Sequence, residues 1–261
     1  MAKQQHSHQP PHADPAGSRR VRATLVTLRA GTSGYAYRAW SPAFYPPKAK
    51  ATELLARYAE RLSTVEANST FRKMPPAGTL AGWVKSVPPG FVFAVKAPQQ
   101  ITHYWRLRNC ADFLTALFAG VDELGAHAGP ILFQLAPQMK LDLGRLEGFL
   151  AELPDHRRYA FELRHPTWLV EEVYAALRKK GAALVWTDDP DHQTPEVTTA
   201  DFGYIRLRKD KYSAASLRRW RDKIAAQPWQ HAYAFVRHDE TADAPKWALA
   251  LGKASANAIH Q

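Results

Sequence analysis

Carboxylate and basic side chains recur at the ends of several short apolar runs of this 261-residue chain. Glu66 and Glu162 are the carboxylates in this setting, and Lys96 and His103 supply nitrogen groups that can also exchange a proton. Two carboxylates whose surroundings push their pKa values apart provide a general acid and a general base. These four residues are therefore the candidate catalytic groups.

The other polar residues near these runs predict a binding site for an anionic ligand. Arginine holds phosphate or carboxylate groups through a planar fork of donors, and aromatic rings can stack on a flat ligand. The candidate substrate-binding residues are Asn68, Gln134, Arg164, His165, Asp188, Arg206, Arg208, Arg237, Trp40, Tyr45 and Trp168.

The elements that must position these residues alternate along the chain. Apolar runs predict strands over 25–33, 63–67, 91–96, 130–135, 158–163, 182–187, 202–207 and 231–236. Helical stretches are predicted over 50–62, 76–86, 110–125, 142–152, 168–180, 213–226 and 243–253, with Asp142 as a helix N-cap. Repeated strand–helix units give parallel strands with right-handed crossovers, and eight such units predict a TIM-type (β/α)8 barrel.

An open, doubly wound α/β sheet is the alternative fold. It is disfavoured because Gly31-Thr32-Ser33-Gly34 lacks the spacing of a dinucleotide-binding loop. The segment 188–201 contains Pro190 and Pro195 and shows no helical pattern, so an irregularity is expected around strands six and seven.

Alternation along the predicted strands decides where the polar groups point. In 158–164, Tyr159, Phe161 and Leu163 share one face, while Glu162 and Arg164 share the other. The runs 64–68, 91–96, 130–135 and 204–208 alternate in the same way. Unpaired charges are costly beneath helices, so the polar face should point into the C-terminal mouth of the barrel. A structural network of ion pairs in the barrel top is the competing interpretation.

Composition bounds the class of protein. With 46% hydrophobic residues the chain matches soluble globular proteins rather than wholly disordered ones. The formal charge of +11 indicates a basic protein that attracts anions. The single cysteine, Cys110, excludes an intramolecular disulfide and is expected to serve packing. Without a long apolar window or an apolar secretory signal, we expect a cytoplasmic protein with no membrane partner.

Two regions divide the chain. Residues 1–23 are rich in Gln, His, Pro and Arg and predict a disordered basic tail, in which His6, His8 and His12 lack the rigid framework of a metal site. Residues 24–261 are expected to form one barrel domain.

Several longer motifs resemble a known family. The strings GTSGYAYRAWSPAFYP (31–46), TVEANSTF (64–71), FVFAVKAPQQITH (91–103), GPILFQLAP (129–137), FELRHPTW (161–168) and DFGYIRLR (201–208) are similar to the domain of unknown function 72 family, also called YecE-like. The resemblance runs from about residue 30 to the C-terminus. It implies a TIM-type barrel and no established activity. The family's characteristic positions map onto Gly34, Trp40, Tyr45, Glu66, Asn68, Thr70, Phe71, Lys96, Thr102, His103, Gln134, Glu162, Arg164, His165 and Trp168.

Two stretches depart from the family pattern. Arg206-Leu207-Arg208-Lys209 stands where the family usually has Arg-Leu-His-Gly, and Arg237-His238 stands where it usually has paired asparagines. Both changes add positive charge near the mouth. They predict a ligand that is more anionic than is usual in the family.

Three functional interpretations follow. The first is an enzyme of hydrolase or lyase type that uses acid–base chemistry on a small anionic ligand, such as a phosphorylated one. The second is nucleic-acid binding or processing, with the basic segment 206–223 along the backbone and bases stacked on Tyr35, Tyr37, Trp40 and Trp105.

The third interpretation is a metal-dependent hydrolase or isomerase. Its ligands would be Glu66, Glu162, Asp188 and either His103 or His165. Cations crowded at the same mouth disfavour it, so no metal ligands are assigned. The sequence predicts neither a cofactor nor an oligomeric state.

Overall fold

The computed structural model describes residues 26–237 and 240–253. Within them, the strands belong to one sheet with the order β6-β5-β4-β3-β2-β1-β10-β9-β7-β8. The predicted basic tail over 1–23 lies outside the described residues, as does His238. The strands are β1 (Thr27–Ser33), β2 (Thr64–Ala67), β3 (Val92–Lys96), β4 (Ala128–Gln134), β5 (Tyr159–Glu162), β6 (Ala183–Leu184), β7 (Trp186–Asp189), β8 (His192–Gln193), β9 (Phe202–Leu207) and β10 (His231–Val236).

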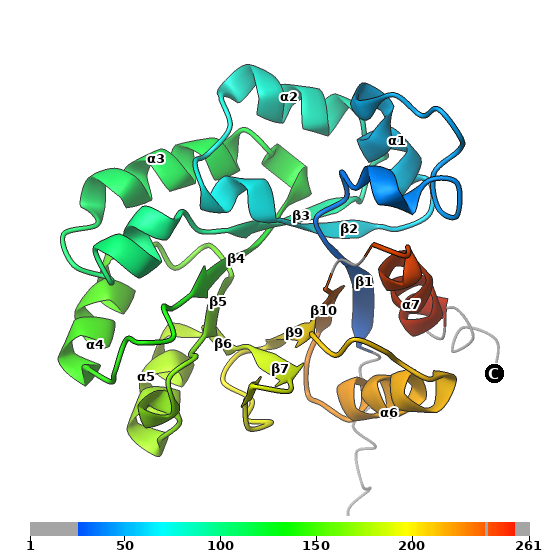
Figure 1. Cartoon of the computed structure of the whole chain (residues 1–261). Helices are drawn as coiled ribbons and strands as arrows, with labels where there is room; N and C mark the ends of the chain where they lie inside the picture. The colour runs from blue at the N-terminus through cyan, green and yellow to red at the C-terminus, as the bar shows by residue number, and fades with distance from the viewer. Residues whose placement is uncertain (1–25, 238–239, 254–261) are drawn as a thin grey trace, which may run out of the picture.

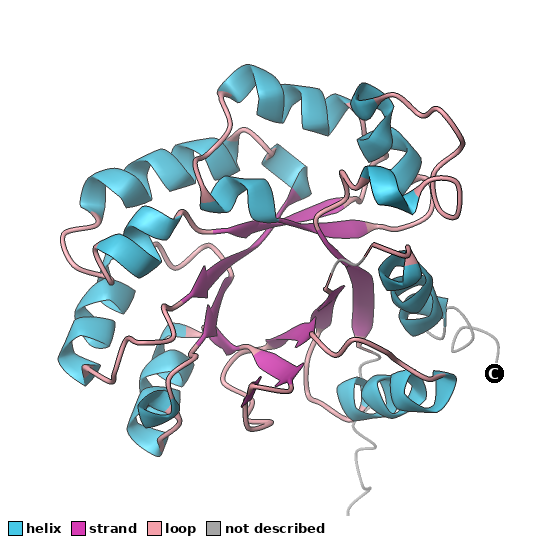
Figure 2. Cartoon of the chain, in the orientation of Figure 1, coloured by secondary structure: helices cyan, strands magenta, loops and turns pink. Residues whose placement is uncertain are grey.

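The sheet curls around a central space, with helices on its outer side (Figures 1 and 2). Neighbouring strands pair in parallel, except in the antiparallel hairpin of β7 and β8. Because parallel strands run in one direction, their carboxyl ends lie at the same end of the curled sheet. The prediction of an α/β fold built on parallel strands is confirmed.

The predicted strand over 182–187 is divided in the structure. β6 pairs with β5 and β7 pairs with β9, and Val185 separates the two strands in the chain. The chain then forms the β7–β8 hairpin, and no helix occurs in the described segment 190–201. The curled sheet is therefore irregular here, as the prolines predicted, and its strand pairing does not give a regular eightfold barrel.

The helices match the predicted helical stretches, with shorter ends. Asp142 caps α4 by accepting a hydrogen bond from the backbone N–H of Arg145, which confirms the predicted N-cap. Cys110 is fully buried and precedes α3. The helices are α1 (Leu54–Ala59), α2 (Ala77–Lys85), α3 (Ala111–Asp122), α4 (Leu143–Glu152), α5 (Glu171–Lys180), α6 (Ala214–Ala225) and α7 (Asp243–Gly252).

Side-chain alternation divides the core into two layers. Phe93, Phe133 and Phe161 belong to the large cluster that includes buried residues of the helices. The opposite parity supplies a smaller apolar cluster, to which Leu132 and Tyr204 belong. This second cluster is formed almost wholly by strand residues, so it fills the concave side of the sheet, and the polar groups of the same parity lie nearer the carboxyl ends of the strands.

No helix in residues 26–237 and 240–253 combines the length and the apolar character needed to cross a bilayer.

Candidate functional site

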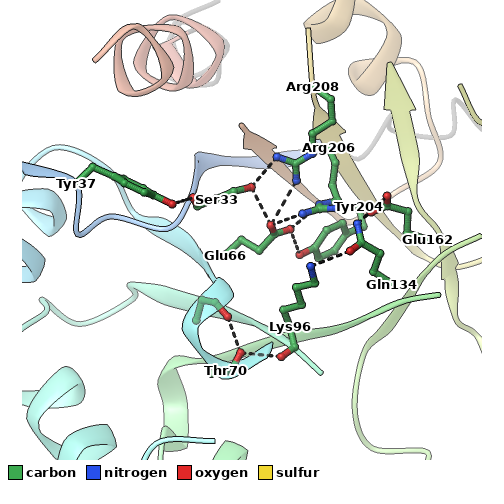
Figure 3. Close-up of polar contacts among 11 residues, drawn as sticks. Ser33, Tyr37, Glu66, Thr70, Lys96, Gln134, Glu162, Tyr204, Arg206 and Arg208 are labelled. Carbon is green, nitrogen blue, oxygen red and sulfur yellow. Dashed lines mark hydrogen bonds and ion pairs between the residues drawn. The ribbon is translucent and has the colours of Figure 1, made fainter. Parts of the chain in front are cut away.

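A buried guanidinium joins two carboxylates at the carboxyl ends of three strands (Figure 3). Arg206 of β9 donates from Nε to Oε2 of Glu66 over 3.0 Å and from Nη2 to Oε1 of Glu66 over 2.9 Å. Its Nη1 donates to Oε2 of Glu162, on β5. The structure thus brings the two predicted carboxylates to opposite sides of one arginine.

Glu66 receives further donors from the same interior. The hydroxyls of Ser33 and Tyr204 each donate to a Glu66 oxygen over 2.8 Å, and Arg208 Nη2 lies 3.4 Å from Oε1. Burial raises the pKa of Glu66, but Arg206, Arg208 and these hydrogen bonds outweigh burial and hold the pKa well below its usual range. Glu66 is therefore a fully paired carboxylate in this structure.

Gln134 connects this network to Lys96. Its Nε2 donates to Oε1 of Glu162 over 2.9 Å, and its Oε1 accepts a hydrogen bond of 2.8 Å from Lys96 Nζ. Burial raises the pKa of Glu162, but the charges of Arg206 and Arg208 and the hydrogen bonds from Gln134 and Arg206 outweigh burial. The pKa of Glu162 therefore lies below its usual value. The bridging amide keeps the amine of Lys96 hydrogen-bonded to a neutral group rather than to a carboxylate.

Lys96 sits at the partly exposed edge of the network. Its Nζ lies 4.1 Å from the centre of the Phe71 ring. Burial and then the charge of Arg206 lower the pKa of Lys96 to about 8, against the opposing pull of Glu66 and Glu162. A substantial share of neutral amine is therefore present at mildly alkaline pH, which lets Lys96 accept a proton or act as a nucleophile.

His103 and Arg164 lie beside Lys96 at the edge of the network. His103 follows β3 in the one-turn π-helix Gln100–Tyr104, its Nδ1 is 2.9 Å from the Thr102 hydroxyl, and its ring packs on Phe71. Burial, then Lys96 and Arg164, lower the pKa of His103. Arg164 forms no ion pair with a carboxylate of the described residues. The guanidinium of Arg164 is thus the permanent positive charge at this edge.

The chain beyond His103 is strained and exposes large rings. Arg106, Leu107 and Asn109 adopt positive φ angles of 49°, 67° and 49°, which are uncommon for residues with side chains. Tyr104 is 68% exposed and Trp105 is 48% exposed. Backbone strain and single-turn π-helices both concentrate at functional sites.

Asp188 and Arg237 lie outside the network around Arg206, whereas Arg208 belongs to it through Glu66 and Ser33. Asp188 is buried and accepts hydrogen bonds from the Arg208 backbone N–H and the Tyr212 hydroxyl. Arg208 itself points inward and donates from Nη1 to Ser33 over 2.9 Å. Arg237 is exposed and pairs with Asp210 in the loop after β9.

Asn68 directly follows β2, and His165 lies three residues after the end of β5. Asn68 is half-buried, and its buried Oδ1 has no hydrogen-bond partner among the described residues. His165 is half-buried and its Nδ1 lies 2.9 Å from the Thr167 hydroxyl, in the turn before α5. Asn68 thus has free acceptor capacity near the mouth.

Three aromatic residues predicted at the rim lie in the core instead. Trp40 and Tyr45 stack on each other and are 0% and 1% exposed, because the loop after β1 folds back against the outer face of the sheet. Trp168 is 0% exposed and donates from its ring nitrogen to the Met139 carbonyl. Their burial differs from the predicted position at the rim, and their role in binding a ligand stays a prediction.

Two members of the network were not among the predicted site residues. Ser33 ends β1, and Tyr204 shares the face of Arg206 and Arg208 on β9. The alternation that predicts an inward position for Arg206 and Arg208 predicts the same for Tyr204. The position of Ser33 at the carboxyl end of a strand likewise indicates a place at the mouth.

The residues proposed as metal ligands do not gather around one point. Within the described part of the chain, no group of three or more His, Cys, Asp or Glu side chains is arranged to hold a metal ion. Arg206 lies between Glu66 and Glu162, and Asp188 bonds to a different set of groups.

Comparison with known proteins identifies related chains. The profile of a family described as "Protein of unknown function DUF72" matches residues 29–260. The UPF0759 protein YecE of Escherichia coli K12 is 30% identical over 118 residues, which make up 45% of this chain and 43% of that protein, and the YecE of strain O157:H7 matches equally. The aligned part thus spans less than half of these relatives.

Solved structures share the fold. A DUF72 family protein of Thermotoga maritima superposes with a TM-score of 0.77 at 22% identity, over 88% of this chain and 99% of that one. A DUF72 family protein of Enterococcus faecalis superposes with a TM-score of 0.73 at 18% identity, over 89% of this chain and 99% of that one. At these identities the likeness shows the fold alone.

Proposed function

The chain belongs to the DUF72 family of proteins of unknown function, and we propose that it is an enzyme that transfers a proton to or from a small anionic ligand at the carboxyl ends of its strands. Lys96 and His103 are the proposed proton-transfer groups, and Arg164 and Asn68 are the proposed binding groups. The reaction class is that of a hydrolase or lyase. In this proposal the curled sheet works as a TIM-type barrel, with its chemistry at the C-terminal mouth.

One observation carries this proposal: the half-buried amine of Lys96 donates to the neutral Gln134 amide and forms no ion pair with a carboxylate of the described residues, and its pKa is lowered. Most surface lysines are fully charged at neutral pH, since the ordinary pKa is about 10.4. A lysine with a pKa of about 8 can change its charge during a reaction near neutral pH. Such perturbed groups concentrate at functional sites.

The two carboxylates have a supporting part in this proposal. Glu66 and Glu162 accept the donors of Arg206, which fixes their charge and geometry. A carboxylate with a lowered pKa stays ionised and is a weak proton acceptor. Their predicted roles as acid and base are therefore assigned to Lys96 and His103, which lie at the accessible edge.

Protection of Lys96 from acylation tests the proposal. Acetic anhydride modifies neutral amines, and mass spectrometry reads the modification peptide by peptide. Malonate, a small dianion, is expected to slow modification of Lys96, while sodium chloride at equal ionic strength does not. Exposed Lys85, at the end of α2, provides the internal reference. Equal rates at Lys96 with and without malonate, across a panel that also includes inorganic phosphate, would contradict the proposal.

The exposed rings after His103 favour a second candidate function, which is binding of single-stranded nucleic acid. Tyr104 and Trp105 are followed by exposed Arg106 and Arg108. Rings that stack on bases beside cations that meet phosphates are the pattern of such surfaces. Its test is the affinity for a labelled oligonucleotide of mixed sequence, which should fall steeply with salt and fall further in Trp105→Ala. A weak affinity that neither salt nor this substitution changes would remove this candidate.

A further inference from the structure

A cavity lies outside the Lys96 site, on the outer side of the irregular part of the sheet. Its volume is about 600 Å³, and its walls come from β7, the β7–β8 hairpin, the loop after β9 and helix α6. No helix occurs in the segment 190–201, and the hairpin follows β7 instead (Figure 1). This volume falls in the range of small-molecule sites, roughly 300–1,000 Å³.

The cavity carries positive charge that its own acids do not neutralise. Lys209, Lys211 and Arg219 line it with exposed side chains, and none forms an ion pair with a carboxylate of the described residues. Its two acidic residues are already engaged. Glu196 pairs with Lys223, and Asp188 accepts from Tyr212 and from a backbone N–H.

Helix α6 adds to this positive field. The helix has 12 residues, and its N-cap Ser213 lines the cavity together with Ser216. Its first turn contains no acidic residue that would offset the positive end of the helix dipole. A helix N-terminus beside three unpaired cations favours a phosphate group over a neutral ligand.

Aromatic side chains supply the apolar part of the lining. Trp186, Tyr212 and Trp220 contribute rings to the walls. Trp186 is held by Trp229, with ring centres 4.7 Å apart, and Tyr212 by Trp247 at 5.3 Å. Trp186 and Tyr212 are nearly buried, so the half-buried ring of Trp220, with Lys223 Nζ 4.9 Å from its centre, offers most of the surface for a flat group.

We propose that this cavity binds a mononucleotide, a phosphate monoester that carries a planar ring. Lys209, Lys211 and Arg219 hold the phosphate at the start of α6, and the ring of the ligand lies against the aromatic wall. The site is distinct from the one around Lys96, because its lining includes none of Lys96, Gln134, Glu162 and Arg206. This proposal does not depend on the proposed function of Lys96.

Calorimetric titration of the full chain with adenosine monophosphate tests the proposal. Adenosine and inorganic phosphate, which correspond to the two parts of adenosine monophosphate, are titrated separately for comparison. The double variant Lys209→Gln/Arg219→Gln removes two of the cations. The control Arg218→Gln removes an exposed cation of α6 that does not line the cavity.

Saturable binding of adenosine monophosphate, stronger than that of either half, is the expected result. The double variant should bind it about tenfold more weakly or worse, since charge-assisted hydrogen bonds are lost. Arg218→Gln and Lys96→Met should leave it unchanged. Absence of saturable binding, or equal weakening in Arg218→Gln, would overturn the proposal. So would tighter binding of a single-stranded oligonucleotide that the double variant abolishes, because the cavity would then be part of a nucleic-acid surface.

Discussion

Arg206 and Glu66 form a two-pronged ion pair in the interior although 140 positions separate them in the chain. Glu66 is 0% exposed and Arg206 is 5% exposed. A buried pair of this kind holds β2 and β9 in a fixed relation across the curled sheet. With Glu162 on the remaining side, the same guanidinium connects a third strand.

Removal of this guanidinium should destabilise the protein. Arg206→Met leaves Glu162 and part of Glu66 without a counter-charge in the interior, and such a loss costs about 3–5 kcal/mol of unfolding free energy. Urea denaturation at pH 7 measures this difference. Arg164→Met, which breaks no ion pair of the described residues, should change the same free energy by less than about 0.5 kcal/mol.

The loss should also depend on pH. In the native wild type the pKa values of both glutamates are lowered, so their stabilisation is present above the ordinary glutamate pKa of about 4.3 and declines as the pH falls below it. In Arg206→Met burial prevails, above all at Glu162, and its raised pKa makes acidification favour the folded state. The two denaturation curves should therefore approach each other between pH 7 and pH 4. A gap that is constant with pH would mean that the carboxylates are not the cause.

Gly31 of β1 packs closely against the backbone of β2. A Cβ atom at this position would lie 2.1 Å from the backbone oxygen of Thr64 in β2, so Gly31→Ala must displace a strand that carries Glu66. We expect a loss of about 1–3 kcal/mol of unfolding free energy. Gly82→Ala is the matched control, because its Cβ meets no atom within 4 Å on helix α2 and should stabilise by about 0.5–1 kcal/mol. Equal effects of the two substitutions would contradict this packing.

Much of the network can be predicted from the sequence, because the alternation of side chains between the two faces of a strand is a local property. Glu162 and Arg206 were placed on the inner face by their apolar neighbours alone, and the structure has them in contact. The division of the sixth predicted strand at Val185 cannot be predicted from this alternation. It depends on which neighbours β6 and β7 reach in the curled sheet.

The burial of two aromatic residues also could not be predicted from the sequence. Trp40 and Trp168 stand in polar loops beside predicted site residues, which favoured a role at the rim. Their burial depends on how those loops fold back onto the sheet and helices, and no local pattern encodes that path. Asp188 likewise satisfies a backbone N–H of Arg208, a partner that only the tertiary structure defines.

Gln134 gives the amine of Lys96 a neutral hydrogen-bond partner in place of a carboxylate. Gln134→Glu would place a carboxyl group 2.8 Å from the position of Nζ and 2.9 Å from Oε1 of Glu162, and the added negative charge of this carboxyl pair favours the ammonium form. We therefore expect the pKa of Lys96 to rise by about 1 or more. The pH dependence of Lys96 acylation in this variant measures the shift. An unchanged midpoint would show that the amide does not set the charge of the amine.

The pKa of Lys96 in the wild-type protein tests the central claim most directly. The rate of its modification by acetic anhydride, followed by mass spectrometry from pH 6 to pH 11, reports the fraction of neutral amine. The same peptide in 8 M urea gives the unfolded reference. We predict a midpoint near pH 8 in the folded protein and one near the ordinary lysine value of about 10.4 in urea. A folded midpoint equal to the unfolded one would contradict the account of Lys96 as a reactive group.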